Sequence, residues 1–242
     1  MSRQPLSPAA RRLEYPTTDG KPMAETDLHR DLMVALIETL KAFYRDEPLV
    51  YVSGNLLLYY EKGNRRKHLA PDVFLVRGVA KHRRENYLLW EEDHPPRFVI
   101  ELTSSSTRRE DTNRKKALYR DVLKVREYFL FDPNEDYLTP SMQGWRLVKG
   151  VYKSIRAVDG RLPSQTTGLH LERDGNELRL WNPATQEWLL VPVQAEHRLR
   201  LQAEVQAEQA AERAEQATER ADRAEAELRR MRERYGPSND AT

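Results

Sequence analysis

Two apolar segments with a helical segment between them constrain the fold of this chain more than any other feature. The segments RFVIEL (97–102) and VREYFLFDP (125–133) are rich in β-branched and aromatic residues, which favours buried strands. Between them, Thr107 and Glu110 have the spacing of a capping box, so a helix is expected from about 108 to 123. A helix that joins two strands of one sheet is typical of a βαβ unit. The sequence therefore predicts an α/β fold with both strands in one sheet.

The segments around this unit add a further helix and more strand candidates. From Glu25 to Pro48, apolar residues recur every three or four positions, which predicts an amphipathic helix. LVYVSGNLLLYYE (49–61) is expected to form a strand or a hairpin, and LAPDVFLV (69–76) a second strand. Several short strand candidates separated by turn residues follow in 142–194, and we interpret them as hairpins appended to the core.

The C-terminal part of the chain follows a different pattern. From Ala203 to Tyr235, small or apolar residues alternate at spacings of three and four, which is the heptad pattern of a coiled coil. The other positions are mostly Glu, Arg and Gln. We expect one long coiled-coil helix over 195–235, which associates weakly because alanine buries little apolar area. A single solvated helix, held by ion pairs four residues apart, is the alternative.

These patterns divide the chain into four parts. Residues 1–22 contain four prolines and a glycine and lack apolar periodicity, so we interpret them as an irregular N-terminal arm. Residues 23–194 form the expected domain with the α/β core. The coiled-coil helix follows over 195–235, and 236–242 are expected to be a disordered tail.

Composition excludes several classes of protein. The mean hydropathy is −0.81, and no apolar run approaches the roughly 20 residues that a membrane span requires. The N-terminal residues lack the apolar stretch of a secretory signal, so a cytoplasmic location is expected. The chain has no cysteine, which excludes disulfides and thiolate-bound zinc and leaves oxygen and imidazole as metal ligands. A net charge of +2 argues against binding nucleic acid through bulk charge alone.

The candidate chemistry lies in one short stretch of the sequence. Asp72 stands at the start of a predicted strand, Glu101 ends RFVIE on the next strand, and Lys115 lies in the helix that follows. Taken singly, such residues are commonly turn formers or solvated charges. Acids at the ends of strongly apolar strands, however, are costly to bury and are usually retained for function. Two carboxylates suit Mg²⁺ or Mn²⁺, and a lysine beside them suits phosphodiester hydrolysis.

Several segments of the sequence resemble the Uma-two family, a bacterial branch of the PD-(D/E)XK restriction-endonuclease-like superfamily. They lie within about residues 15–195 and include YPTTDGKPMAETDLHR, VYVSGNLLLYYEKGN, APDVFLV, FVIELTSSSTRRED, KALY, VREYFLFDP and GLHLERDGNELRLWNP. The resemblance implies a restriction-endonuclease-like core for residues 23–194, with a central mixed sheet flanked by helices. It also implies an endonuclease that hydrolyses DNA with Mg²⁺ or Mn²⁺.

The resemblance assigns roles to individual residues. The aspartate of the PD motif falls on Asp72 and the acidic strand residue on Glu101, so these two would bind the metal. In the superfamily pattern the lysine lies two residues beyond the glutamate, where this chain has Thr103. In the Uma-like branch it lies on the following helix, which matches Lys115. The accessory candidates are Thr103, Lys116 and Tyr119, together with Glu25 and His29 on the first predicted helix, although a single histidine there is more often structural.

Basic clusters flank the proposed site in the sequence and are candidates for contacts with DNA phosphates. Solvated loop charges are the default interpretation of such clusters. The candidates are Arg65, Arg66 and Lys67 before the site and Arg108 and Arg109 after it, with a further cluster at Lys81, Arg83 and Arg84.

Two functions remain open at this point. The first is a metal-dependent DNA endonuclease that uses Asp72, Glu101 and Lys115. The second is a catalytically inactive binding or scaffold module of the same fold, displayed by the coiled coil. In either case residues 200–235 are expected to pair two copies of the chain into a homodimer, and no membrane is involved.

Overall fold

Strands β6 (Phe98–Leu102) and β7 (Glu127–Phe131) are parallel neighbours, and a helical segment connects them. They form the βαβ unit that the two apolar segments predict. Every residue of both strands is buried, which explains why their sequences are apolar toward both faces of the sheet. The structure is a computed structural model that describes residues 14–18, 26–104 and 107–236.

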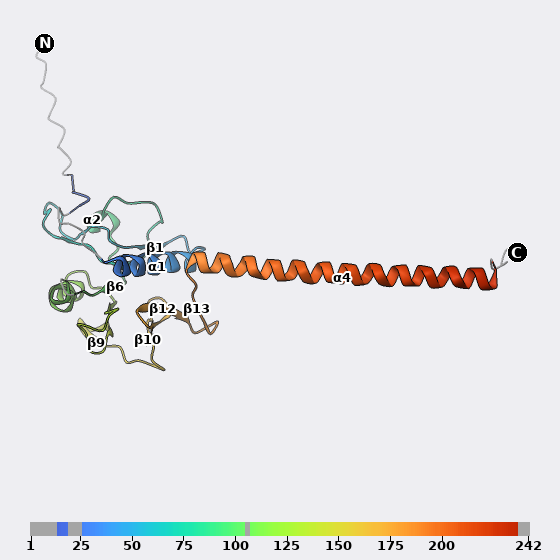
Figure 1. The fold of residues 1–242 in the computed structure, drawn as a ribbon. Coiled ribbons are helices and arrows are strands. Elements are labelled where there is room, and N and C mark those ends of the chain that lie inside the picture. Colours follow the sequence, from blue (N-terminus) through green and yellow to red (C-terminus); the bar gives the residue numbers. More distant parts are fainter. Residues whose placement is uncertain (1–13, 19–25, 105–106, 237–242) are drawn as a thin grey trace, which may run out of the picture. The chain divides into compact units, whose positions relative to one another are not determined.

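A six-stranded mixed sheet is built outward from this pair (Figure 1). The β6–β7 pair is parallel and the other four pairs are antiparallel, so the expected central mixed sheet is confirmed. In spatial order the strands are β1 (Val50–Ser53), β4 (Val73–Arg77), β6, β7, β8 (Met142–Val148) and β9 (Val151–Ser154).

The strands expected as appended hairpins are divided between two sheets. β8 and β9 extend the central sheet, whereas β10 to β13 form a separate antiparallel sheet. A third, three-stranded sheet lies before the βαβ unit in sequence. The strands of the two smaller sheets are β10 (Leu162–Pro163), β11 (His170–Asp174), β12 (Glu177–Asn182) and β13 (Glu187–Trp188), and β2 (Leu58–Tyr59), β3 (His68–Leu69) and β5 (Tyr87–Leu88).

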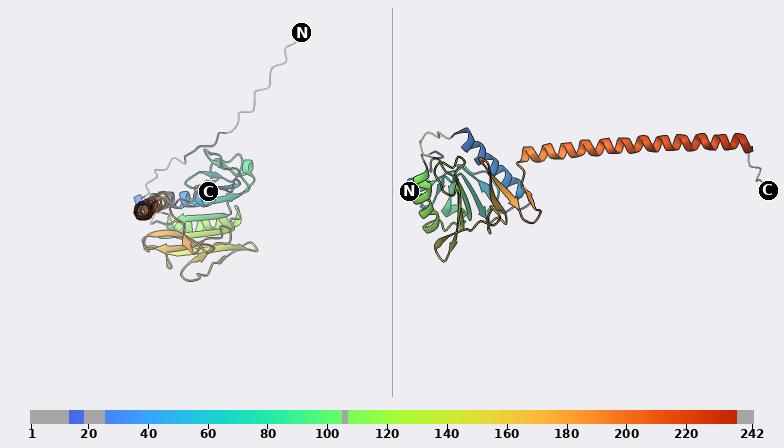
Figure 2. Two further views of the ribbon diagram at one scale, coloured as in Figure 1. Left: turned by 90° about the vertical axis from the view of Figure 1, so that its right-hand side faces the viewer. Right: turned by 60° about the horizontal axis from the view of Figure 1, so that its bottom comes forward.

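The central sheet is covered on both faces. On one face, α1 (Asp27–Phe43) and the β10–β13 sheet pack against alternate strand residues such as Val73 and Ile100. On the other face, residues of the β6–β7 connection pack against Phe74 and Val99. The right view of Figure 2 shows the strands between the blue helix α1 and the green connecting helix. These two layers make the strands of the βαβ unit fully buried.

The connection between β6 and β7 is helical from residue 108 to residue 121, which confirms the expected helix. Its middle is not regular, because η1 (Glu110–Lys115) is π-helical and passes into α3 (Lys116–Asp121). Such π-helical turns are rare and often accompany functional sites. The capping-box pattern gives no sign of this turn.

One described part of the expected N-terminal arm contacts the domain. The Tyr15 ring lies 5.0 Å from that of Tyr59 and 4.9 Å from that of Trp90, measured between centroids. The Tyr15 hydroxyl accepts a hydrogen bond from the backbone N–H of Gly63 at 2.6 Å. Residues 14–18 are therefore attached near the small β2–β3–β5 sheet, while 1–13, 19–25 and the tail 237–242 lie outside the described residues.

The chain divides into two compact units between Val191 and Pro192. The second unit contains α4 (Pro192–Tyr235), one unbroken helix of 44 residues that confirms the expected long helix. Pro192 suits its first turn, where a missing N–H has no cost. A further short helix, α2 (Leu89–Glu92), follows β5. Among the described residues, no helix has both the length and the apolar character of a membrane span.

Glu127, at the start of β7, ties the central sheet to the loop that precedes β11. Its buried carboxylate accepts hydrogen bonds from Arg146 Nε at 2.7 Å, Ser164 Oγ at 2.6 Å, and the backbone N–H groups of Gln165 and Thr166, both at 2.9 Å. Burial raises the pKa of Glu127, but these hydrogen bonds outweigh burial and hold the pKa below its ordinary value.

We expect Glu127→Gln to lower the free energy of unfolding at pH 7 by about 2–3 kcal/mol, because charged hydrogen bonds are lost. A lowered pKa means that the carboxylate stabilises the fold above the ordinary glutamate pKa of about 4.3 and loses this effect below it. Urea unfolding should therefore show a large difference at pH 7 that shrinks below pH 4. The control is Glu177→Gln, an exposed residue of β12, which should change little. An equal loss of unfolding free energy at pH 7 and below pH 4 would contradict the prediction.

Candidate active site

Asp72 and Glu101 meet because their strands are antiparallel. In the β4–β6 pair, Val73 lies opposite Ile100, so one further step along each strand sets Asp72 beside Glu101. The backbone N–H of Leu102 donates a hydrogen bond to Asp72 Oδ2 at 2.7 Å. The two acids of the sequence pattern thus share one end of the central sheet.

The helical connection supplies a lysine to this end of the sheet. Lys115 Nζ lies 2.9 Å from Glu101 Oε2 and 3.0 Å from Asp111 Oδ1. The side chains of Glu101 and Asp111 are 0% and 1% exposed, and that of Lys115 is 13% exposed. The structure therefore brings Asp72, Glu101 and Lys115 together and adds a third carboxylate, Asp111.

Three neutral side chains donate hydrogen bonds to Glu101 and Asp111. The Tyr119 hydroxyl donates a hydrogen bond to Glu101 Oε1 at 2.5 Å. Thr103 Oγ1 donates to Asp111 Oδ2 at 3.0 Å, and the Tyr128 hydroxyl donates to the Asp111 backbone oxygen, also at 3.0 Å. Thr103 and Tyr119, two of the accessory candidates, thus contact the charged cluster.

His29 reaches the cluster from the opposite layer. It lies on α1, and its Nε2 atom is 3.5 Å from Asp72 Oδ2. The side chains of His29 and Asp72 are 10% and 14% exposed. The structure therefore gives the histidine a place beside Asp72, whereas Glu25, the other candidate from the first helix, lies outside the described residues.

The buried cluster shifts the pKa of its acids in opposite directions. Burial raises the pKa of Asp72, but the hydrogen bond from His29 and the charge of Lys115 outweigh burial and leave the pKa below its ordinary value. Burial raises the pKa of Glu101 well above its ordinary value, because the charges of Asp72 and Asp111 oppose the effect of Lys115. Burial lowers the pKa of Lys115, yet the surrounding carboxylates outweigh it and raise the pKa. Lys115 is therefore firmly protonated.

The donor set at this end of the sheet fits a hard divalent cation. Within the described ranges, no group of three or more His, Cys, Asp or Glu side chains is placed to enclose a metal ion. Mg²⁺ does not require such a cage, because it commonly uses one or two carboxylates and completes its shell with water and substrate phosphate. Asp72 and Glu101 provide two neighbouring carboxylates, and their mutual repulsion is what a cation relieves. These two residues are the ones that would hold the ion.

The remaining predicted residues lie apart from the cluster or in structural contacts. Lys116, the other lysine candidate, does not contact the cluster in this way. Its Nζ atom lies over the Trp145 ring, 3.3 Å from the ring centroid. Arg84 Nε forms an ion pair with Glu92 at 2.6 Å, so this arginine has a structural partner. The other basic candidates are largely exposed. Arg108 and Arg109 begin the helical connection, and the rest are in turns and loops: Arg65, Arg66, Lys67, Lys81 and Arg83.

Asp111 is the member of the cluster that the sequence analysis missed. The sequence feature that could have indicated it is spacing. Asp111 precedes Lys115 by four residues, so the two side chains lie on the same face of a helix. An acid in the first turn of a predicted helix is ordinarily explained by the helix dipole, which hides this signal.

A mixed sheet flanked by helices, with two acids at adjoining strand ends and a lysine from the next helix, defines the restriction-endonuclease-like class of α/β protein. A family model described as "Uma2: Putative restriction endonuclease" matches residues 2–211. The chain belongs to the Uma2 family, and the resemblance seen in the sequence is confirmed. Membership places it in a family of nucleases.

Comparison with solved structures finds a crystal structure of "a putative nuclease belonging to DUF820" from Anabaena variabilis. Its sequence is 15% identical, the TM-score is 0.45, and the match covers 66% of this chain and 90% of that chain. Comparison with curated proteins finds no significant match.

Lys115 should be essential to the stability of this cluster. We expect Lys115→Met to lower the free energy of unfolding by about 3 kcal/mol at pH 8, because two buried carboxylates lose their counter-charge. The pKa of Glu101 is already raised, so protonation relieves the repulsion at lower pH, and the loss should shrink toward pH 5. Urea unfolding at both pH values measures the difference.

The matched control is the adjacent Lys116→Met, which removes a cation–π contact and should cost only about 0.5–1 kcal/mol at either pH. Adding Glu101→Gln to Lys115→Met should recover part of the lost stability. A Lys115 variant as stable as the control would show that the buried charges are not coupled.

Proposed function

We propose that this protein is a metal-dependent DNA endonuclease that hydrolyses phosphodiester bonds. The observation that carries the proposal is the meeting of Asp72 and Glu101 at adjoining strand ends with Lys115 Nζ 2.9 Å from Glu101. Membership of the Uma2 family supports a nuclease. The basic surface residues support an anionic polymer as the substrate.

Asp72 and Glu101 would hold Mg²⁺ or Mn²⁺ beside the scissile phosphate. The ion supplies a Lewis acid that lowers the pKa of water and neutralises phosphate charge. Asp72 suits the role of a permanent ligand, because its pKa is lowered and it stays ionised. The hydrogen bond from Leu102 fixes the direction of its carboxylate.

Lys115 acts through its positive charge. Its raised pKa makes it a poor base toward water, so it serves to hold the attacking group and to stabilise the negative charge that develops on the phosphate. Asp111 and Glu101 position its ammonium group, and Tyr119 positions Glu101. Arg108 and Arg109 follow β6 closely in the chain, and we assign them contacts with neighbouring phosphates.

Plasmid cleavage tests this function. The protein should nick or linearise plasmid DNA with Mg²⁺ or Mn²⁺ and lose the activity in a chelator. Asp72→Ala and Glu101→Gln should each lower the rate by at least about 100-fold, because the ligands of the ion are lost. Lys116→Ala, whose side chain faces Trp145, should stay close to the parent rate.

A thermal shift separates loss of metal from loss of chemistry. Mn²⁺ should raise the melting temperature of the parent protein, because a ligand of the folded state stabilises it, and Glu101→Gln should remove most of the increase. A folded parent protein that neither cleaves DNA nor responds to Mn²⁺ would instead support the inactive binding module.

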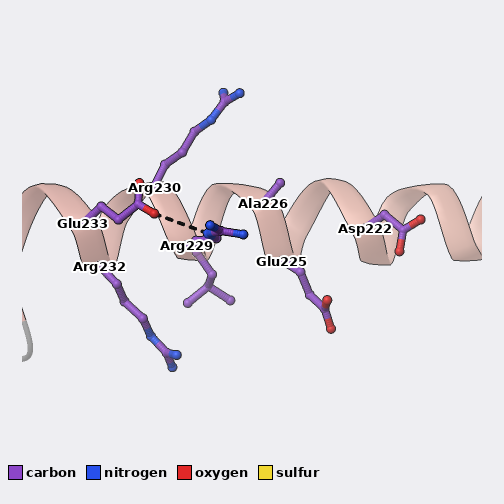
Figure 3. A pocket seen from close by; sticks show the side chains of 8 residues that line it. Asp222, Glu225, Ala226, Arg229, Arg230, Arg232 and Glu233 are labelled. Carbon is purple, nitrogen blue, oxygen red and sulfur yellow. Dashed lines mark hydrogen bonds and ion pairs between the residues drawn. The ribbon is translucent and has the colours of Figure 1, made fainter.

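We also propose that α4 pairs two copies of the chain over residues 200–235. The apolar side chains of α4 are exposed, including Leu228 and Met231, which continue the alanine heptads. The hollow drawn in Figure 3 is lined by α4 alone, and within it Arg229 pairs with Glu233 at 3.3 Å. Charges beside the heptad positions favour a parallel pair, since Arg220 would face Glu225 of the second copy.

The full chain should sediment as a dimer in the micromolar range. Ala217→Glu with Ala224→Glu places charges at the heptad contact and should give monomers. Ala226→Glu adds the same side chain on the outer face of α4 and should leave the dimer intact. A parent protein that stays monomeric across this range would refute the pairing and leave the nuclease proposal unchanged.

A further inference from the structure

A second set of charges lies at the end of the central sheet opposite the candidate active site. Arg77 ends β4, and Arg97 and Arg126 immediately precede β6 and β7. Asp72 and Glu101 lie toward the other ends of β4 and β6. At about 3.3 Å per residue, four residues of β6 separate Arg97 from Glu101 by roughly 13 Å. The two charged ends are therefore distinct sites of one sheet.

A cavity of about 700 Å³ opens at this second end. One acid, Glu127, lines it together with six cationic side chains. These cations define the basic pocket: Arg77, Arg97, Lys124, Arg126, Arg146 and Lys149.

The charges of the basic pocket are not balanced by the fold. Glu127 pairs with Arg146 at 2.7 Å, and Arg77 pairs with Glu47 at 3.1 Å. Arg97, Arg126 and Lys149 form no ion pair in the part of the chain that the structure describes. Gathering like charges around one cavity costs free energy, and an anionic ligand offsets that cost.

The lining also indicates which kind of anion fits. Arginine guanidinium groups match the geometry of phosphate oxygens and bind them through paired hydrogen bonds. The residues that line the cavity include no aromatic side chain on which a base could stack. Such a lining recognises phosphate rather than base and suits contacts that do not depend on sequence.

We propose that the basic pocket binds the phosphate backbone of a nucleic acid strand outside the scissile position. The identity of this ligand rests on the proposed function. A spacing of roughly 13 Å corresponds to about four steps of a duplex strand at 3.4 Å each. A strand engaged at both ends of the sheet is thereby held at the candidate active site and again about four nucleotides to one side of it.

Binding of a duplex oligonucleotide in a chelator tests the pocket without any cleavage. Arg126→Gln with Lys149→Gln removes two exposed cations of the pocket. Fluorescence anisotropy at about 100 mM salt should show an affinity about 10-fold lower. The slope of log K against the logarithm of the salt concentration should become shallower, by the amount expected for the loss of nearly two phosphate contacts. The matched control is Lys62→Gln with Arg156→Gln, which removes one lysine and one arginine from exposed positions outside the pocket and should weaken binding much less.

Equal losses in the two double variants would overturn the proposal, because bulk charge alone would then explain binding. It would also be overturned if the parent protein bound no DNA, or if the pocket variant lost affinity for inorganic tripolyphosphate while its DNA affinity stayed unchanged. Equal melting temperatures of the variants confirm that both are folded. Asp72→Ala distinguishes this inference from the proposed function, since it should abolish cleavage and keep the effect of the pocket variant on binding.

Discussion

The buried carboxylate of Glu101 is the group on which the rest of this end of the sheet depends. It lies one residue before the end of a strand that is otherwise apolar, and burying it without partners would cost several kcal/mol. Lys115 and Tyr119 supply those partners, and both come from the helix that connects β6 to β7. The connecting helix must therefore return across the sheet with one face turned toward Glu101. The requirement that makes the strand stable also assembles the candidate active site.

Charge is divided along the central sheet. One end has three carboxylates around Lys115, and the other has six cations around Glu127. In each case one residue of the opposite sign joins neighbouring elements of the fold: Lys115 pairs with Glu101, and Glu127 pairs with Arg146. The carboxylates of the first end attract divalent cations, and the cations of the second end attract phosphates. A hydrolytic site on a polyanion needs both, because the carboxylates that hold a metal would otherwise repel the substrate.

The sequence predicted the features that rest on local patterns. β6, β7 and their connection follow from apolar runs and helix spacing, and Asp72 and Glu101 from acids at strand ends. The basic pocket was not predicted, because its six residues are spread from Arg77 to Lys149 and meet only through strand order. The same applies to β8 and β9, whose alternation resembles that of any hairpin until their pairing with β7 is known. Register across a sheet is a tertiary property that single segments do not encode.

The π-helical turn explains why Asp111 belongs to the cluster. Asp111, Lys115 and Tyr119 are four residues apart, and in a regular α-helix each such step overshoots a full turn by about 40°. Over two steps, one of the three side chains would rotate away from Glu101. A π-helical turn contains more residues, so η1 (Glu110–Lys115) reduces this drift and keeps the stripe facing the sheet. The departure from regular helix thus brings a third carboxylate within 3.0 Å of Lys115, where it keeps the ammonium charged beside Glu101.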